Sequence, residues 1–316
     1  MLNKILYSLI KIFITLVKYF KLERFFFDKI IFNIGLKQLI ENKKYYNEFT
    51  CLQQADLKIF SQNGEDGIID YILYKLDIVS PNFVEIGVGN YRESNTRFLY
   101  NKTHPKGLII DCEDNLREKV KPHVNLWKGG LKIHQEVITS NNINEILNTN
   151  CDFNIDLFSI DIDSVDYWII SKLKANISKI FVAEFNPIFG SDLEVTVPNL
   201  DGFNRNKYHY SNLCYGMSLR ALIRLMDKKN YYFLGTNLQK MNAFFISKDF
   251  EKGNFFSKIK IKDYSEYINS NIRDSRDKEN NLNYLSGDDK IKEIENCEVI
   301  NLKDNLHKIE KLKNLL

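Results

Sequence analysis

The segment Asn82–Tyr91 constrains the fold of this chain more than any other stretch. It reads Asn-Phe-Val-Glu-Ile-Gly-Val-Gly-Asn-Tyr, so an apolar run expected to be a strand ends in a Gly-x-Gly turn. Because glycine has no Cβ, the backbone at such a turn can approach a ligand closely. A strand that runs into this kind of turn is typical of α/β proteins with an open parallel sheet, although a plain tight turn has the same pattern.

Apolar segments of strand length alternate with helical patterns from there to about residue 250. This alternation predicts a Rossmann-like, mostly parallel seven-stranded sheet with helices on both faces, the last two strands pairing antiparallel. The expected strands are Phe83–Gly87, Lys106–Asp111, Leu131–Val137, Ile155–Asp161, Ile180–Glu184, Tyr231–Thr236 and Ala243–Ser247. The expected helices are one that Ser61 caps, Ile143–Leu147, Trp168–Leu173 and Ser218–Lys229.

Composition divides the chain into three regions. Residues 1–50 are predicted to be an amphipathic helical arm of two helices that separate near Gly35, and residues 51–250 the α/β domain. Residues 251–316 form a charged extension, with thirteen basic and thirteen acidic side chains. Its last part, Leu302–Leu316, has the pattern of one amphipathic helix, and no residue of the extension suggests chemistry.

The N-terminal arm is both apolar and basic. Residues 1–48 hold nine Lys or Arg and four Asp or Glu, and Lys4, Lys11 and Lys18 would lie along one helix face. Lys11 interrupts the apolar run, which disfavours a helix that spans a bilayer. We expect an interfacial helix at a membrane surface, or a helix that packs on the protein's own body or on a second subunit. The expected location is cytoplasmic, with peripheral contact at the inner membrane face.

The overall composition disfavours several function classes. A net charge of +3 disfavours a nucleic-acid binder. The five cysteines lie far apart, as expected of reduced thiols in a cytoplasmic protein, and with five histidines they show no zinc-ligand spacing.

Acidic residues stand at the ends of four expected parallel strands: Glu85, Asp111, Asp161 and Glu184. The carboxyl ends of such strands meet at one edge of the sheet, where ligands bind. Asp161, Glu184 and Asn186 offer three hard oxygen ligands, which suits Mg²⁺. Alternatively, Asp161 contacts the amino group of a ligand, or Asp163 and Asp166 cap the following helix.

Two nucleotide-like ligands compete for the turn. A dinucleotide fold needs a small residue at the third position of Gly-x-Gly-x-x-Gly, where this chain has Arg92. S-adenosylmethionine (SAM) has no pyrophosphate, and its enzymes tolerate a looser turn with an acid ahead of it. Asp111 follows Gly87 at the distance expected of a carboxylate that holds ribose hydroxyls, with Glu113 as the substitute if the register is shifted. The candidate SAM-binding residues are Glu85, Gly87, Gly89, Asn90, Asp111 and Glu136 or its neighbour Val137.

A long polar and aromatic stretch, Pro187–Tyr215, follows the fifth strand and is expected to cover the same edge of the sheet. Its histidine, His209, is a candidate general base beside Asp161, although a surface histidine is commonly inert. Aromatic side chains beside polar groups suit a sugar-like acceptor, and they equally suit simple packing.

Six blocks together resemble bacterial class I SAM-dependent methyltransferase-like proteins related to the FkbM type. They lie at Ser61–Ile69, Phe83–Thr96, Asp156–Trp168, Val182–Gly190, Tyr215–Leu222 and Met241–Phe245. Three positions depart from the family pattern: Ser164 and Met217 replace glycine and alanine, and Lys240-Met241 precedes Asn242-Ala243.

The resemblance implies a Rossmann-like methyltransferase core that uses SAM. We expect an O-methyltransferase whose acceptor is a sugar or other small hydroxyl compound of surface-polysaccharide synthesis. Mg²⁺ is expected from the three oxygen ligands named above and not from the resemblance. The alternatives are a non-catalytic binding module of the same fold, recruited through residues 1–50, and an NAD-dependent oxidoreductase, which Arg92 disfavours.

Overall fold

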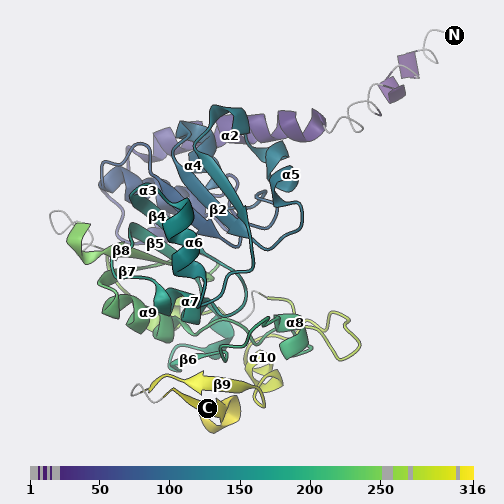
Figure 1. Ribbon diagram of the computed structural model, residues 1–316, viewed down its shortest axis with the longest axis vertical. Coiled ribbons are helices and arrows are strands. Elements are labelled where there is room, and N and C mark those ends of the chain that lie inside the picture. The colour runs from purple at the N-terminus through teal and green to yellow at the C-terminus, as the bar shows by residue number, and fades with distance from the viewer. Residues whose placement is uncertain are drawn as a thin grey trace.

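The computed structural model describes residues 6–7, 10–12, 15, 22–250, 259–269, 273–303 and 307–316. Its centre is a seven-stranded sheet with the order β3-β2-β1-β4-β5-β8-β7 (Figure 1). The strands are β1 Phe83–Ile86, β2 Gly107–Asp111, β3 Leu131–Gln135, β4 Ile155–Ile160, β5 Ser178–Glu184, β7 Tyr231–Thr236 and β8 Asn242–Ser247. Every strand that the sequence predicted is present.

The pairing of the strands confirms the mostly parallel arrangement. β1 pairs in parallel with β2 and β4, β2 with β3, and β4 with β5. Only β8 runs against its two neighbours, β5 and β7. The parallel strands at the centre are covered on both faces, which explains why all four residues of β1 and the first four of β2 are buried without alternation.

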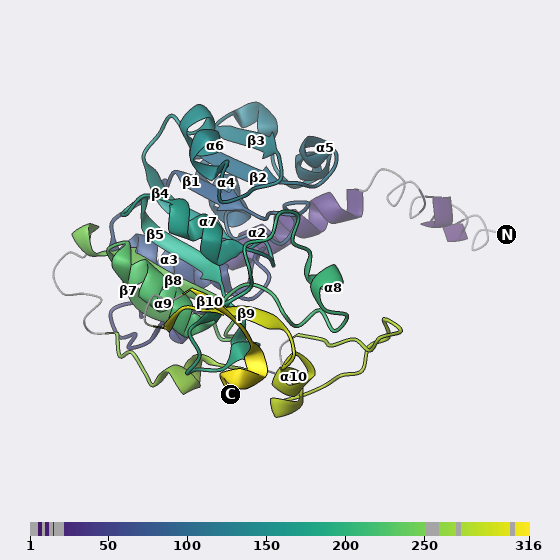
Figure 2. The ribbon, with the colours of Figure 1, turned by 60° about the horizontal axis from the view of Figure 1, so that its bottom comes forward.

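Helices form a layer on each face of this Rossmann-like sheet (Figure 2). They are α3 Glu65–Lys75, α4 Arg97–Thr103, α5 Leu116–Val120, α6 Ile143–Asn150, α7 Asp166–Lys172 and α9 Leu219–Lys228. α3, α4 and α5 share one hydrophobic core with Phe83, and α6, α7 and α9 share the other with Val84. Consecutive side chains of a strand point to opposite faces, so each central strand supplies both cores.

The N-terminal region differs from its prediction. A single helix, α2 Leu22–Asn42, runs through Gly35, and most of residues 1–21, where the first predicted helix begins, lie outside the described residues. Gly35 marks a close contact, because a Cβ there would lie 2.6 Å from Cγ1 of Ile59. The helix needs a small residue at this point because it lies close to the rest of the protein there. Gly35 therefore allows close packing, and the helix continues through it. None of the helices in the described part of the chain has the length and apolarity to cross a bilayer.

Ser61, the predicted N-cap residue of α3, is not the N-cap in the structure. The helix begins at Glu65 after Gly64, whose φ is +92°. Ser61 stands before this turn, and its hydroxyl accepts a hydrogen bond from the backbone N–H of Asp66 at 3.1 Å. The serine therefore stabilises the start of the helix without being its N-cap residue.

The C-terminal region forms a second sheet instead of the predicted amphipathic helix. β6 Val195–Thr196, β9 Glu298–Asn301 and β10 Lys308–Lys311 are antiparallel in the order β10-β9-β6, and the short helices α8 Arg205–Tyr208 and α10 Asp288–Glu293 lie beside them. The buried side chains of this region, Val299, Leu302 and Leu312, belong to the same hydrophobic core as α9. The composition change near residue 250 therefore does not separate two hydrophobic cores.

Candidate functional site

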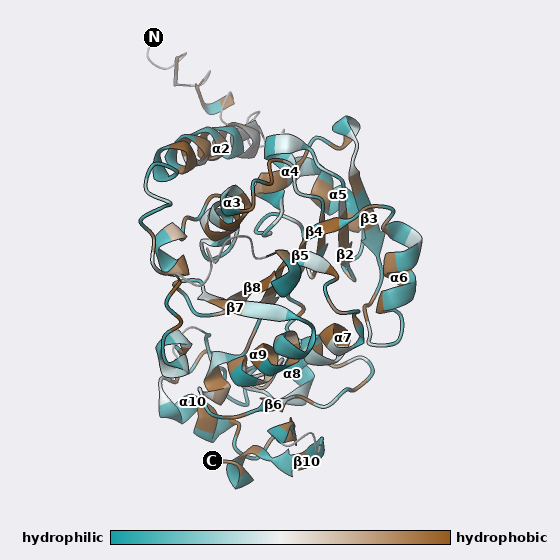
Figure 3. Ribbon diagram, turned by 90° about the vertical axis from the view of Figure 1, so that its left-hand side faces the viewer, coloured by the Kyte–Doolittle hydropathy of each residue, from teal (hydrophilic) through white to brown (hydrophobic). Residues whose placement is uncertain are grey.

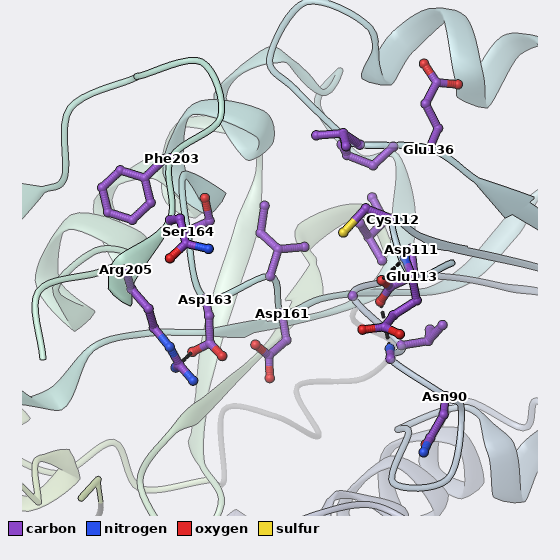
Figure 4. Close-up of a pocket in the computed structure, with 18 of the residues that line it drawn as sticks. Asn90, Asp111, Cys112, Glu113, Glu136, Asp161, Asp163, Ser164, Phe203 and Arg205 are labelled. Carbon is purple, nitrogen blue, oxygen red and sulfur yellow. Dashed lines mark hydrogen bonds and ion pairs between the residues drawn. The ribbon is translucent and has the colours of Figure 1, made fainter. Parts of the chain in front are cut away.

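A cavity of about 590 Å³ opens at the carboxyl ends of β1, β2, β3 and β4 (Figure 4). This is the edge of the sheet at which ligands of open α/β proteins bind. Residues from the turn after β1, from Asp111–Glu113, from Glu136–Ile138 and from Asp161–Ser164 line it, together with Phe203–Asn206 and Gln62. The edge that the sequence predicted is therefore a real concavity of ligand size.

The Gly87–Gly89 turn forms one wall of the cavity. Gly87 has a φ of +84°, and a Cβ there would lie 1.6 Å from the backbone oxygen of Asp161, so no other residue fits without a shift. Gly89 has a φ of +52°, and no atom lies within 4 Å of the place where its Cβ would be. One glycine lets β1 and β4 approach each other, and the other leaves open space on the cavity side.

Asp111 is held by this turn. Its Oδ2 accepts the backbone N–H of Gly89 at 2.6 Å, and its Oδ1 accepts that of Glu113 at 3.0 Å (Figure 4). Both donors are backbone groups, so the carboxylate has a defined orientation and keeps further lone pairs toward the cavity. The predicted register is correct, because Asp111 ends β2 and Glu113 follows in the loop.

Glu85 has another role than ligand contact. Its carboxylate is buried behind the turn, where it accepts the hydroxyls of Ser94 and Thr96 and the backbone N–H groups of Asn95 at 2.8 Å and Thr96 at 3.1 Å. Thr96 directly precedes α4. Burial raises the pKa of Glu85, against the effect of these hydrogen bonds. Glu85 is not among the lining residues, and it positions the loop that follows the turn.

The remaining predicted cofactor residues, Asn90 and Glu136, do line the cavity. The side-chain oxygen of Asn90 accepts the backbone N–H of Arg92 at 3.0 Å, which stabilises the turn. Glu136 contacts Nε2 of His134 at 2.8 Å and accepts from the amide of Asn142 at 3.0 Å. Val137 and Ile138 lie beside it and add apolar surface to the wall beyond β3.

A cluster of carboxylates lies at the end of β4 and β5. One oxygen each of Asp161, Asp163 and Glu184 lies within 4.8 Å of the others. An arginine from the C-terminal region is already among them, because Arg273 Nη2 lies 2.8 Å from Glu184 Oε1 and 2.9 Å from Asp163 Oδ1. Arg205 Nη1 lies 2.6 Å from the same oxygen of Asp163 (Figure 4).

Asn186 does not join this cluster. Its amide donates to the backbone oxygens of Leu213 at 2.9 Å and Tyr215 at 3.0 Å, and its oxygen accepts the N–H of Ile188 at 3.0 Å. The side chain is fully buried and has used its donors and its acceptor to hold the chain after β5. The predicted ligand set is therefore corrected to Asp161, Asp163 and Glu184.

Burial and mutual repulsion change the protonation of these carboxylates. Burial, with Asp163 and Asp166, raises the pKa of Asp161 to about 8. Burial, with Asp161 and Asp163, raises the pKa of Glu184 well above its ordinary value, against the lowering effect of Arg273. Asp161 and Glu184 are hydrogen bonded to each other, so the pair holds a proton at neutral pH.

Two further side chains shape the cluster. Asp166 accepts the backbone N–H groups of Ile162 and Ser164, both at 3.0 Å, and so holds the turn after β4. In this turn Asp163 has the left-handed conformation, with a φ of +52°, and Ser164 does not, so the serine fits without strain. The guanidinium of Arg273 lies 4.4 Å from the ring centre of Tyr215, whose buried hydroxyl has no hydrogen-bond partner among the described residues.

His209 is not one of the residues at the cavity. It follows α8 and does not line the cavity, and its Nδ1 is 2.7 Å from the hydroxyl of Ser211. Burial lowers the pKa of His209. Its predicted role as general base is therefore not supported by its position. The stretch that contains it does reach the cavity, through Phe203 and the start of α8 at Arg205.

Sequence reasoning missed the two arginines. Arg205 stands in the stretch that was expected to cover the site, but no pattern distinguishes it from other surface cations. Arg273 lies in an Asn- and Ser-rich segment more than eighty residues beyond Glu184, and only the fold brings the two together. The one signal for these arginines in the sequence was the predicted cluster of carboxylates, because buried carboxylates need a cation nearby to balance their charge.

Comparisons with known proteins give only distant likenesses. No family model and no curated protein matches the chain. A SAM-dependent methyltransferase from Clostridium acetobutylicum is 11% identical, with 57% of this chain and 89% of that chain covered and a TM-score of 0.36. The precorrin-6y C5,15-methyltransferase from Geobacter metallireducens is 13% identical, over 61% and 93%, with a TM-score of 0.33. At these values the likenesses carry no argument about the activity of this chain.

Proposed function

We propose that the protein is a SAM-dependent methyltransferase. The observation that carries this proposal is the pairing of Asp111 with the backbone N–H of Gly89 at the cavity wall. A carboxylate oriented in this way at the end of β2 suits the two ribose hydroxyls of an adenosyl group. The strand order, with β8 antiparallel between β5 and β7, agrees with the class I methyltransferase core that the sequence resembles.

The cavity residues fit the other parts of SAM. The open space at Gly89 leaves room for the ligand close to the backbone. Ile138 and Val137 offer apolar contact to an adenine, with Glu136 at its edge. Asp161 stands at the opposite wall, where a carboxylate can meet a ligand's amino group or an acceptor hydroxyl.

A dinucleotide fits this site less well. Its pyrophosphate needs free N–H groups at the start of the helix after the Gly-x-Gly turn. Here α4 begins only at Arg97, and the carboxylate of Glu85 accepts the N–H groups of Asn95 and Thr96 just before it. A negative charge therefore already stands at the helix start, which disfavours a phosphate there.

When bound, SAM supplies an electrophilic methyl group. The protein's part is to align the acceptor oxygen and to exclude water. We propose that the acceptor's hydroxyl proton passes to the ionised form of Asp161, which forms as the pH rises toward about 8 and which the raised pKa makes a stronger base. Phe203 and the amides of Asn204 and Asn206 line the outer cavity, and this combination supports a sugar or other small hydroxyl compound as acceptor, as in surface-polysaccharide synthesis.

The cation of this site is proposed to be Arg273 instead of Mg²⁺. Its guanidinium contacts two of the three carboxylates that would bind a metal. A metal ion would have to displace this ion pair and the proton shared by Asp161 and Glu184. We therefore expect ligand binding to be independent of Mg²⁺.

Calorimetric titration with S-adenosylhomocysteine tests the proposal. We expect micromolar binding that is unchanged by Mg²⁺ and that falls at least about tenfold in Asp111→Asn, because a hydrogen bond to a charged group contributes about 1.5–3 kcal/mol. Asp114→Asn, an exposed acid three residues further on, is the matched control and should bind normally.

Two outcomes would contradict the proposal. Binding of NADH without S-adenosylhomocysteine would favour an oxidoreductase. No binding of either compound by a folded sample would favour a non-catalytic module.

A further inference from the structure

Helix α2 has an apolar face that the rest of the protein leaves uncovered. Phe27, Ile30, Ile31 and Ile34 are 61%, 52%, 42% and 64% exposed. Their spacing of three, four and seven residues places them on one side of the helix. Figure 3 shows that α2 carries hydrophobic residues, drawn in brown, among hydrophilic ones. We call these four residues the α2 stripe. Contiguous apolar surface of this kind marks an interaction site.

The opposite side of α2 is the one that packs on the body. Phe32 lies with its ring centre 5.5 Å from that of Phe98, and Leu39 is fully buried. Asp28 forms an ion pair with the buried Arg97 of α4. Because these contacts fix the rotation of the helix, the α2 stripe cannot turn inward without breaking them. The protein's own body therefore does not cover the stripe.

The charges beside the stripe are positive. Lys37, seven residues after Ile30, lies at the edge of the stripe; it is exposed and has no carboxylate within ion-pair distance among the described residues. Lys29 lies farther round the helix, on the side of Asp28 and Phe32. The two acids between Phe26 and Asn42 are already paired, Asp28 with Arg97 and Glu41 with Lys44. The stripe thus has an unpaired cation at its edge, in a region whose first 48 residues carry a surplus of five positive charges.

A cationic cleft adjoins the same helix. Its lining includes Lys29 of α2 together with Lys121 and Lys128 of the segment after α5, and its volume is about 520 Å³. Only one acid, Asp28, lines it, and Arg97 neutralises that acid. Positive charge therefore continues from the helix onto the neighbouring loop.

A second copy of this chain is a poorer occupant than a lipid surface. Stable protein interfaces use about 20–30 residues a side, and the stripe has four. Two stripes packed face to face would also bring Lys37 of each copy to the interface without an unpaired acid to match it. An anionic bilayer satisfies both features, since the apolar side chains enter its interface and Lys37 meets its headgroups.

We propose that the α2 stripe docks the protein on an anionic membrane surface, with Lys37 against the lipid phosphates. The cavity lies at the strand ends, so docking through α2 leaves Asp111 and Asp161 outside the contact. The proposal is independent of the methyltransferase reaction. It locates the membrane contact on a helix that is tied to the folded body through Asp28 and Arg97.

Flotation of the full-length protein with lipid vesicles tests this proposal. We expect binding to an equal mixture of phosphatidylglycerol and phosphatidylcholine, weak binding to phosphatidylcholine alone, and release at high salt. Ile30→Ser with Ile34→Ser should weaken binding at least about tenfold. Lys37→Gln should weaken it about fivefold. Val79→Ser with Leu238→Ser, which alters exposed apolar residues elsewhere, is the control and should bind normally.

The stripe side chains face solvent, so the variants should keep the wild-type melting temperature. Absence of flotation, or equal flotation with neutral vesicles, would overturn the proposal. A dimer in light scattering that Ile30→Ser with Ile34→Ser abolishes would also overturn it, because the stripe would then be an interface between copies.

Discussion

The carboxyl group of Asp161 lies in the cavity wall between other acids, and its surroundings determine its charge. Asp163 and Asp166 repel its ionised form, and Glu184 shares a hydrogen bond with it. The sequence placed Asp161 at the end of a strand and beside Glu184, which the structure confirms. It did not indicate that Arg273 lies among these acids, because spacing along the chain says nothing about a segment that returns from far away.

This environment predicts a pH dependence of stability. The pKa of Asp161 is raised to about 8, so the folded state holds a proton that the unfolded state loses above its ordinary pKa. The resulting stabilisation is complete below that ordinary value and is lost as the pH rises through about 8. Asp161→Asn keeps an oxygen that can accept the hydrogen bond from Glu184, and it carries no charge. We expect the variant to be at least about 1 kcal/mol more stable than the natural protein near pH 9 and similar to it near pH 5.

Urea unfolding at the two pH values measures this difference. Asp114→Asn removes an exposed carboxylate and should show no such change. A variant that is less stable than the natural protein at the higher pH would mean that Asp161 is ionised and stabilising in the folded state.

At the scale of the elements, the sequence predicted strands better than helix ends. Strands β1, β2 and β4 are short apolar runs bounded by polar residues, and their burial on both faces keeps this signal clear. Gly35 was expected to divide two helices, and it lies inside α2 instead. A glycine in a helical pattern has the same appearance whether it ends the helix or lets it approach a neighbour such as Ile59.

Because β1 and β4 lie close together at Gly87, alanine should destabilise the protein strongly at Gly87 and only weakly at Gly89. Gly87→Ala would place its Cβ against the backbone oxygen of Asp161, and we expect a loss of at least about 4 kcal/mol of unfolding free energy or no folded protein. Gly89→Ala meets no atom and should cost only about 1–2 kcal/mol for its left-handed backbone. It should nevertheless weaken S-adenosylhomocysteine binding, since the methyl group enters the space of the ligand.

Thermal melting and calorimetry of both variants check this pair of expectations. A stable Gly87→Ala protein with normal binding would show that β1 and β4 can separate at this point. Unchanged binding by Gly89→Ala would place the ligand elsewhere in the cavity.

At the scale of the whole molecule, the C-terminal region completes the site. β9 pairs with β6, and the preceding segment carries Arg273 to the ends of β4 and β5. We expect Arg273→Ala to lose about 3–5 kcal/mol of stability at neutral pH, because it removes the ion-pair partner of the buried Glu184, while Arg205 still contacts Asp163. The loss should shrink near pH 5, where Asp161 and Glu184 are more fully protonated. Arg276→Ala, which removes a guanidinium that donates to the backbone oxygen of Asn280 at 2.9 Å, is the control.

Melting of these variants with and without Mg²⁺ distinguishes the two candidate cations. Mg²⁺ should partly restore the stability of Arg273→Ala, since Asp161, Asp163 and Glu184 are then free to bind it, and should leave the natural protein unchanged. Stabilisation of the natural protein by Mg²⁺ would instead support a metal site beside the arginine.

The sequence by itself determined which strands and helices follow one another along the chain, the glycine turn after β1 and the acids at the strand ends. These features depend on neighbouring residues, whose periodicity and backbone freedom can be read locally. The tertiary structure alone decided that Glu85 holds the loop before α4 and that the side chain of Asn186 is hydrogen bonded to backbone groups. It also decided that Arg273 forms ion pairs within the acid cluster. The partners in those contacts are brought together by the packing of whole elements, and the pattern along the chain does not record which distant donor reaches a given acceptor.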